Sequence, residues 1–316
     1  MKVIDDNKYN VGGGGNPILE SKIDSRKIII AGNGPSVKEI DYKRMPLDCD
    51  IYRCSQFYFE DKYYLGKKIK GVNSVPFAVY NQFYNLCLLL QNKEYFFEEL
   101  IMTGMPEEFK SLDDFKRDYP NAIIGYKLLE RIPAYFNYIN FYELYFGQRP
   151  TSAVQLCAIA VARGYKEIYV VGIDFYEKGQ YSYFYDFDKT NLGQFLPKYD
   201  ITERECHNKT LDINALVFLQ EHYNVNIYSL CPNSPFSKYF PLTPNIDSNF
   251  VVESKSEHNQ TDIIIPNLQH VKSNKNRFKE INSLKHGWRN NIYYKIFKDL
   301  FRLPSDVKNY LKAKKI

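Results

Sequence analysis

The chain of 316 residues has little of several features that would assign a protein quickly. It holds a single Trp, and its six cysteines include no Cys-x-x-Cys spacing, which favours reduced core thiols in a cytosolic protein over a disulfide framework. No apolar run approaches membrane-spanning length. Residues 1–26 are polar and contain four consecutive glycines, so they lack a signal-peptide pattern and are expected to form a flexible leader.

Tyrosine and phenylalanine are abundant, at 28 and 22 residues. Tyrosine suits pockets for sugars and nucleobases, because its ring stacks and its hydroxyl forms hydrogen bonds. AT-rich codon usage, which raises Tyr, Phe, Asn, Lys and Ile together, explains most of the excess. Composition otherwise is that of a globular protein, with 25% charged and 44% hydrophobic residues.

The most informative stretch is a buried-strand pattern at residues 28–31 that runs into Gly-Asn-Gly-Pro-Ser at 32–36. Two glycines allow close backbone approach to a ligand, and the start of the following helix offers N–H donors to a phosphate. Pro35 suits the first helical position and Ser36 can help cap the helix. The pattern is neither Gly-x-Gly-x-x-Gly nor a Walker loop, so alone it is equally typical of a turn that binds nothing.

Strand and helix patterns alternate along the chain and predict an α/β fold with a mostly parallel sheet covered by helices on both faces. Ligands bind beyond the carboxyl ends of such strands, where residues 32–34 and 174–176 both fall. Residues 106–140 are predicted to be helical cover, and residues of about 177–206 a mobile lid. Strands are expected at 27–31, 48–54, 69–75, 97–102, 166–172 and 225–230, and helices at 76–92, 151–163 and 212–223.

Several short motifs occur in an order that resembles bacterial lipooligosaccharide alpha-2,3/alpha-2,8-sialyltransferases of glycosyltransferase family 42. They lie at residues 30–36, 53–61, 149–152, 164–176 and 303–306. The resemblance implies a Rossmann-like variant of the GT-A fold over residues 27–270, and transfer of sialic acid from CMP-sialic acid to galactose or sialic acid on a surface glycolipid. It also implies inversion at the anomeric carbon, no metal, no cofactor beyond the donor substrate, and a homotetramer.

The same resemblance implies roles for individual residues. Arg149 matches a residue near the acceptor, and Tyr176 matches a tyrosine that donates to the departing phosphate. A second such tyrosine falls in the lid, where Tyr183 is favoured over its neighbours Tyr181 and Tyr185. Donor contacts are implied for Gly32, Asn33, Gly34, Ser55, Gln56, Gln82, Thr151, Ser152, Gly172 and Phe175.

His207 is the candidate general base, because it lies between the predicted lid and a helix and an imidazole titrates near neutral pH. Position alone favours a solvated loop histidine, and the motif match reverses that preference. The other four histidines are His222 on a helix and three in the charged C-terminal region. Asp186 and Asp188 form an Asp-x-Asp pair, which other nucleotide-sugar transferases use for a metal, but here they are interpreted as solvated acids in the lid.

Some residues depart from the family pattern at the donor pocket. Ser55 and Val75 stand where the family has asparagines that contact the donor, and Ala153 replaces a glycine. Asn73 lies near enough to substitute for the asparagine at 75. Two alternatives therefore stay open: a transferase of the same fold that uses another nucleotide sugar, and a non-catalytic nucleotide-binding homologue.

Positive charge is concentrated at the C-terminus. Residues 272–316 hold 13 Lys or Arg against three Asp or Glu, whereas the whole chain has a net charge of +5. Apolar residues recur at helical spacing from 292 to 311, with basic residues between them. Such a basic amphipathic segment suits the anionic inner face of a membrane, and nucleic-acid binding is the alternative for the same charge. We expect residues 271–316 to form a membrane-associating tail.

Overall fold

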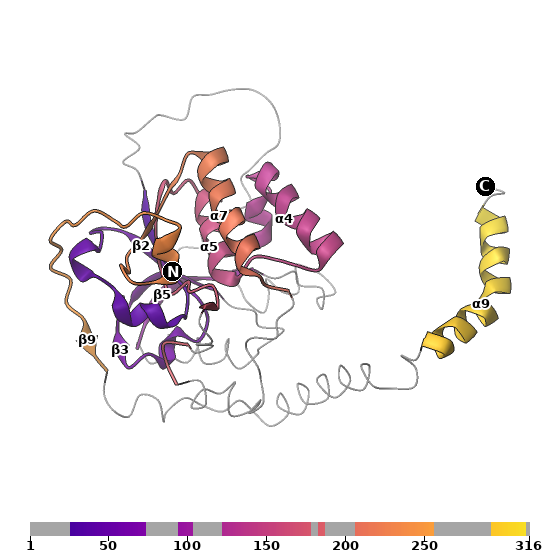
Figure 1. The fold of residues 1–316 in the computed structure, drawn as a ribbon, viewed down its shortest axis with the longest axis horizontal. Coiled ribbons are helices and arrows are strands. Elements are labelled where there is room, and N and C mark those ends of the chain that lie inside the picture. Colours follow the sequence, from indigo (N-terminus) through magenta and orange to yellow (C-terminus); the bar gives the residue numbers. More distant parts are fainter. Residues whose placement is uncertain are drawn as a thin grey trace.

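The computed structural model describes residues 26–73, 94–103, 122–177, 183–186, 206–255 and 292–313. Figure 1 shows a sheet domain and a helix, α9 (Ile292–Ala313), that lies apart from it. Several predicted features fall outside the described residues: residues 1–25 of the leader, the helix 76–92 with Gln82, and most of the lid, including Tyr181 and Asp188.

Seven parallel strands form one sheet in the order β6-β5-β4-β2-β1-β7-β8. The chain moves outward from β1 to β6, then crosses back to place β7 on the other side of β1. A reversal of this kind opens a crevice at the carboxyl ends of the two central strands, which is where doubly wound folds bind ligands. The strands are β1 Lys27–Ala31, β2 Asp50–Arg53, β4 Lys68–Asn73, β5 Phe96–Met102, β6 Ala122–Ile124, β7 Glu167–Val171 and β8 Asn226–Ser229.

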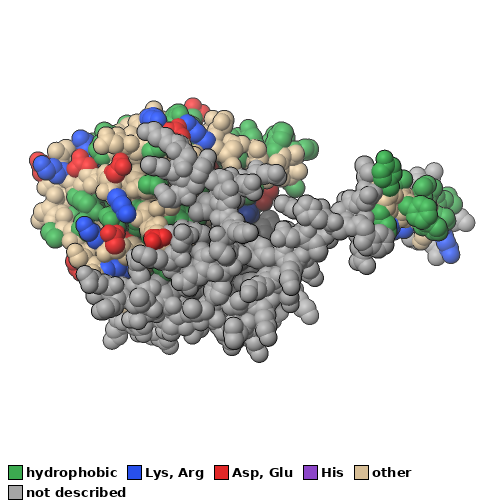
Figure 2. Space-filling model, turned by 60° about the horizontal axis from the view of Figure 1, so that its bottom comes forward, with side chains coloured by type: hydrophobic (Ala, Val, Ile, Leu, Met, Phe, Trp, Pro, Cys, Tyr) green, Lys and Arg blue, Asp and Glu red, His purple; other side chains and the backbone are tan. Residues whose placement is uncertain are grey.

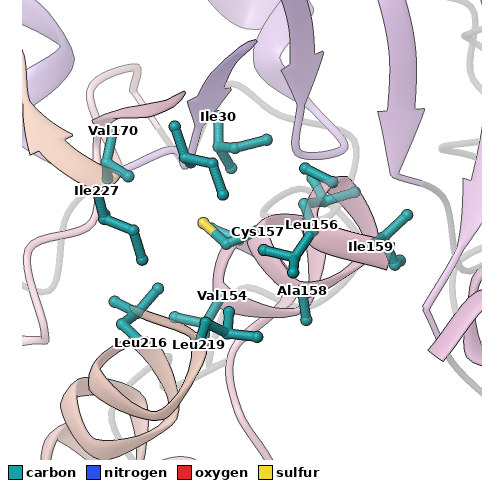
Figure 3. Packing of buried hydrophobic residues seen from close by; sticks show 14 of the residues in the cluster. Ile30, Val154, Leu156, Cys157, Ala158, Ile159, Val170, Leu216, Leu219 and Ile227 are labelled. Carbon is teal, nitrogen blue, oxygen red and sulfur yellow. The ribbon is translucent and has the colours of Figure 1, made fainter. Parts of the chain in front are cut away.

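One face of the sheet is covered by α-helices. Helix α5 (Ser152–Ala162) is built of small and branched apolar residues and lies between the sheet and α7 (Lys209–Tyr223). Figure 3 shows Cys157 and Val154 of α5 between Ile30 and Val170 of the sheet and Leu216 and Leu219 of α7. The short helix α3 (Gly125–Leu129) and the longer α4 (Pro133–Phe146) extend this layer. The helices predicted at 151–163 and 212–223 are confirmed, and α7 begins three residues earlier than expected.

Alternate residues of β1 pack into two hydrophobic clusters on opposite faces of the sheet, because successive side chains of a strand point to opposite faces. Ile28 and Ile30 pack under α5, whereas Ile29 and Ala31 join a second cluster rich in tyrosine and phenylalanine. The described cover of this second face consists of short turns and a two-stranded antiparallel sheet. These are the 3-10 turns η1 Pro35–Glu39, η2 Tyr42–Arg44 and η3 Phe57–Phe59, and the strands β3 Lys62–Tyr63 and β9 Glu253–Ser254. A further 3-10 turn, η6 Pro235–Lys238, buries Phe236 in the first cluster instead.

Candidate active site

The two predicted turns interlock at the carboxyl edge of the sheet. Gly32 N donates to Val171 O and Gly34 N donates to Gly172 O, each at 2.9 Å. A Cβ atom on Gly32 would lie 2.2 Å from Gly172 O, and Gly172 itself has a left-handed φ of +67°. Only glycine allows two backbones to approach this closely. The turns after β1 and β7 therefore form one edge, as predicted.

The helix start after this turn is not an open anion site. Ser36 N donates to Asp174 Oδ2 at 2.9 Å, and Ser36 Oγ accepts from Gly172 N at 3.2 Å instead of capping the turn. The predicted free donors and the Ser36 cap are therefore wrong, because a carboxylate of the protein occupies the position expected for a phosphate. Burial raises the pKa of Asp174, and the hydrogen bonds from Ser36 lower it in part.

Two carboxamides at the same edge keep a buried atom without a hydrogen-bond partner among the described residues. Asn33 Nδ2 donates to Ser55 O at 2.5 Å, but Asn33 Oδ1 has no partner. Gln56 is 3% exposed and accepts from Tyr185 OH at 3.4 Å, while its Nε2 is unpaired. Each unpaired buried group costs about 1–3 kcal/mol, so this acceptor and this donor are candidates to bind a ligand or a water.

His207 is held by main chain. Its Nδ1 lies 2.8 Å from Arg149 O, and Arg149 N donates to Cys206 O at 2.8 Å. A carbonyl oxygen only accepts, so in the neutral imidazole Nδ1 carries the proton and Nε2 is the nitrogen that can accept one. Asn208 then caps α7 by accepting from Leu211 N at 2.7 Å. The Arg149 side chain is exposed.

Helix α5 starts close to the same segment. Thr151 N and Oγ1 both donate to the carboxylate of Asp212 on α7, each at 2.8 Å, and Ser152 begins the helix half-buried. Asp212 is 1% exposed. Burial raises its pKa from 3.8 to about 7, although the two Thr151 bonds act to lower it. Thr151 is thus the N-cap residue that the sequence predicts, but its hydroxyl bonds to α7 instead of its own helix.

Tyr176 follows β7 in an unusual backbone conformation. Phe175 and Tyr176 both have left-handed φ angles, of +51° and +55°, and such strain costs about 1–3 kcal/mol per residue and collects at functional sites. Phe175 is buried against Phe236, whereas Tyr176 is 40% exposed. The turn therefore hides the phenylalanine and presents the tyrosine.

A salt-bridge cluster connects this turn to the segment of His207. Glu177 pairs with Lys209, two residues after His207, and with Lys238 of η6 at 2.9 Å. The hydrogen bonds from Lys209 and Lys238 lower the pKa of Glu177 to about 2. Because Lys209 starts α7, the cluster places the Tyr176 turn beside the segment that carries His207.

The described part of the predicted lid packs against the core. Phe184 and Tyr185 are buried in the second cluster, and Phe184 N donates to Asn33 O at 2.9 Å. Tyr183 is half-buried and stacks on Tyr185 with ring centroids 5.0 Å apart. The sequence shows no core pattern here, yet Phe184 and Tyr185 belong to the core, and the mobility of the lid stays a prediction. Asp186 is exposed, and within the described ranges no cluster of three potential metal ligands occurs.

Comparison with known proteins identifies the family. A family model described as "Alpha-2,3-sialyltransferase (CST-I)" matches residues 26–314. This chain belongs to that family. The predicted membership of the sialyltransferases of glycosyltransferase family 42 is confirmed, and the protein is a glycosyltransferase.

Solved sialyltransferases from Campylobacter jejuni share the fold. The monofunctional alpha-2,3-sialyltransferase Cst-I is 41% identical, with 85% of this chain and 99% of that chain covered and a TM-score of 0.73. CstII in complex with the substrate analogue CMP-3FNeuAc is 43% identical, with 78% and 98% covered and a TM-score of 0.72. An uncharacterized protein of Haemophilus influenzae is 35% identical over 237 residues, 72% of this chain and 98% of that protein.

Sequence reasoning missed three features of this candidate site: the Asp212–Thr151 contact, the Glu177 cluster and the paired left-handed residues. One of them left a signal in the sequence. Asp212 lies on the apolar stripe of α7 formed by Leu211, Ala215, Leu216 and Leu219, where an unpaired charge is costly. The other two depend on contacts between segments far apart in the chain.

Proposed function

We propose that this chain transfers sialic acid from CMP-sialic acid to a galactose or sialic acid on a surface glycolipid, with inversion and with His207 as general base. Membership of a sialyltransferase family supports the donor sugar, and the CMP ligands of related structures support the nucleotide. The single observation that carries the proposal is the position of His207. Arg149 O orients its ring, and His207 lies just before α7, the helix that Glu177 ties to the Tyr176 turn.

The reaction proceeds in one displacement. The acceptor hydroxyl oxygen attacks the anomeric carbon of sialic acid, the bond from that carbon to the phosphate oxygen breaks, and the electron pair leaves with CMP. His207 Nε2 takes the hydroxyl proton, as the Nδ1 bond to Arg149 O prepares it to do. The departing sugar has oxocarbenium character, so stabilisation of the leaving phosphate matters as much as activation of the hydroxyl.

Leaving-group stabilisation is assigned to hydroxyl and carboxamide groups. Tyr176 and Tyr183 would donate to the phosphate, and neutral donors of this kind let the chemistry proceed without metal or other cofactor. Asn33 and Gln56 supply the unpaired acceptor and donor that suit a nucleotide or sugar. We assign Gly32, Gly34, Ser55, Gln82, Thr151, Ser152, Gly172 and Phe175 to the rest of the donor site, and Arg149 to the acceptor.

A matched pair of histidine variants tests the proposal. His222 lies near the opposite end of α7, and its Nδ1 also bonds a carbonyl, Phe218 O, at 3.1 Å. His207→Ala should lower sialyl transfer by at least about 10²-fold while CMP binding by calorimetry changes little, since general-base catalysis contributes 10²–10⁴. His222→Ala should keep both. Normal transfer by His207→Ala would refute the assigned base.

A panel of donors tests the sugar and nucleotide. CMP-sialic acid should be hydrolysed slowly in the absence of acceptor, and UDP- and GDP-sugars should not. Preference for another nucleotide sugar would favour the alternative suggested by Ser55 and Val75. CMP binding without hydrolysis or transfer would favour a non-catalytic homologue.

We further propose that α9 attaches the enzyme peripherally to the cytoplasmic face of the membrane. Its large apolar residues are exposed, among them Phe297 and Leu300, and Lys298 and Arg302 fall on the opposite side at helical spacing. Figure 2 shows hydrophobic side chains gathered on one face of this helix, with basic side chains at its margin. Within the described ranges, no helix has the length and apolarity needed to cross a bilayer.

Vesicle flotation tests this attachment. The full chain should float with vesicles that contain anionic phosphatidylglycerol, and a chain that ends before residue 291 should not. Each basic residue near such a surface contributes about 1 kcal/mol, so added salt should weaken binding. Equal flotation of the shortened chain would contradict the proposal.

A homotetramer is the final part of the proposal. The C-terminal half of α4 exposes Phe141, Leu144, Tyr145 and Phe146, with Leu144 81% exposed. A contiguous apolar patch of this kind marks an interaction surface. Light scattering after gel filtration should give four times the chain mass, and Leu144→Lys should reduce it. A monomer with unchanged activity would contradict this assembly.

A further inference from the structure

Asp212 is a buried carboxyl group that the mechanism above does not use. It lies one turn beyond Asn208, the cap of α7, and both of its oxygens accept from Thr151. Within the described ranges, burial and the Thr151 bonds are what act on its pKa, with no contribution from a Lys or Arg. The titratable groups that face it are the Tyr135 phenol of α4 and the Cys157 thiol of α5, and burial raises the pKa of both.

The segment that leads into α5 contacts the start of α7 at three further points. Asn208 Nδ2 donates to Gln148 Oε1 at 2.8 Å. Arg149 N donates to Cys206 O, and Arg149 O accepts from His207 Nδ1. Residues 148–151 and 206–212 therefore run side by side. The Asp212–Thr151 pair is the deepest of these contacts, because its carboxylate is 1% exposed whereas the His207 bond is exposed.

We propose that Asp212 is a positioning residue that couples the donor site at the start of α5 to the base His207. The inference rests on the proposed function, in which Thr151 and Ser152 contact the nucleotide and His207 takes the acceptor proton. By fixing Thr151 through both its N–H and its hydroxyl, Asp212 sets where α5 begins relative to α7. The distance and orientation between the bound nucleotide and the base His207 then stay fixed.

The chemistry of the contact separates a positioning role from general packing. An apolar residue of similar size, as in Asp212→Leu, leaves the Thr151 N–H and hydroxyl without their partner in a dry site. Asp212→Asn keeps both bonds: its Oδ1 accepts from Thr151 N and its Nδ2 donates to Thr151 Oγ1. The first variant breaks the coupling and the second preserves it.

Steady-state kinetics with CMP-sialic acid on the full chain tests the inference, with rates normalised to the concentration of CMP-binding sites. Asp212→Leu should raise the donor KM and lower kcat, each by about tenfold, because displacements near 1 Å in a site cost up to 10² in rate. Asp212→Asn should restore both constants to within about threefold of wild type. If Asp212→Leu does not fold, Asp212→Glu, which moves the carboxylate by one methylene, should show the same paired change.

Tyr165→Phe is the matched control. Tyr165 is buried next to the opposite end of α5 and its hydroxyl donates to Asp50, so the variant loses a partly buried hydrogen bond away from the site. It should lower the thermal midpoint and leave KM and kcat unchanged. An active wild type in which Asp212→Leu changes only the thermal midpoint, as Tyr165→Phe does, overturns the coupling alone. A wild type that neither binds CMP nor transfers sialic acid overturns the proposed function and the coupling together.

Discussion

Replacement of Asp212 by Asn should change how the stability of the protein depends on pH. Burial raises the pKa of the folded carboxyl from 3.8 to about 7, so the folded state binds this proton more tightly than the unfolded chain does. The stabilisation from the bound proton is complete below about pH 4 and is lost as pH rises through 7. Asn does not titrate and mimics the protonated group.

The expected size follows from the difference between the two pKa values. A change from 3.8 to about 7, at about 1.4 kcal/mol per pH unit, gives at most about 4 kcal/mol. In urea unfolding, Asp212→Asn and wild type should have similar free energies of unfolding at pH 4.5. At pH 8 the variant should be more stable by a few kcal/mol.

Tyr165→Phe serves as the reference variant. Burial raises the pKa of the Tyr165 phenol, so this group stays neutral in the wild type over the whole pH range of the experiment. Its loss of stability should be the same at pH 4.5 and pH 8. The reasoning would be refuted if the free-energy difference between Asp212→Asn and wild type did not grow with pH, or grew in favour of wild type.

Three other outcomes are expected. Gly32→Ala should lower the free energy of unfolding by about 3 kcal/mol, since its Cβ would lie 2.2 Å from Gly172 O. Gly164→Ala, at φ +86° in open space, should lower it by about 1 kcal/mol. Equal shifts of the thermal midpoint in the two variants would contradict this. Asn33→Asp should weaken CMP binding in calorimetry by at least about tenfold, because it adds a charge to a buried acceptor that would face an anionic ligand; unchanged binding would remove Asn33 from the donor site. Lys209→Met should lower kcat about tenfold at every pH from 5 to 9, because the pKa of Glu177 near 2 keeps the pair charged throughout. Lys238→Met leaves α7 tied to Glu177 and should lower kcat less. A larger loss of kcat in Lys238→Met than in Lys209→Met would contradict the importance of the link to α7.

Much of the fold could be predicted from local pattern. The β-branched runs at 28–30 and 168–171 are central strands, and the small residues of 152–162 form the helix between them and α7. These segments carry their own signal, because burial on both sides leaves only apolar residues. The resemblance to the family then rested on several motifs that occur in one order, which is more specific than any single pattern.

The parts that sequence reasoning placed wrongly depend on partners distant in the chain. Ser36 has the residue type of a helix cap, yet it bonds to Gly172, 136 residues away. The amide expected to bind phosphate donates instead to Asp174, 138 residues on. Residues 184 and 185 have no recognisable period, because two aromatic side chains can fill a gap in a tyrosine-rich cluster without belonging to a helix or strand.

Orientation of His207 by a peptide carbonyl has an evolutionary consequence. Where a carboxylate side chain orients a catalytic imidazole, substitution of that residue removes the orienting group. Here the oxygen belongs to the backbone of residue 149, and every amino acid supplies it. The exposed Arg149 side chain therefore has no part in orienting the imidazole. Under the proposed function, residue 149 can therefore change to suit a different acceptor sugar while His207, the proposed base, keeps its tautomer.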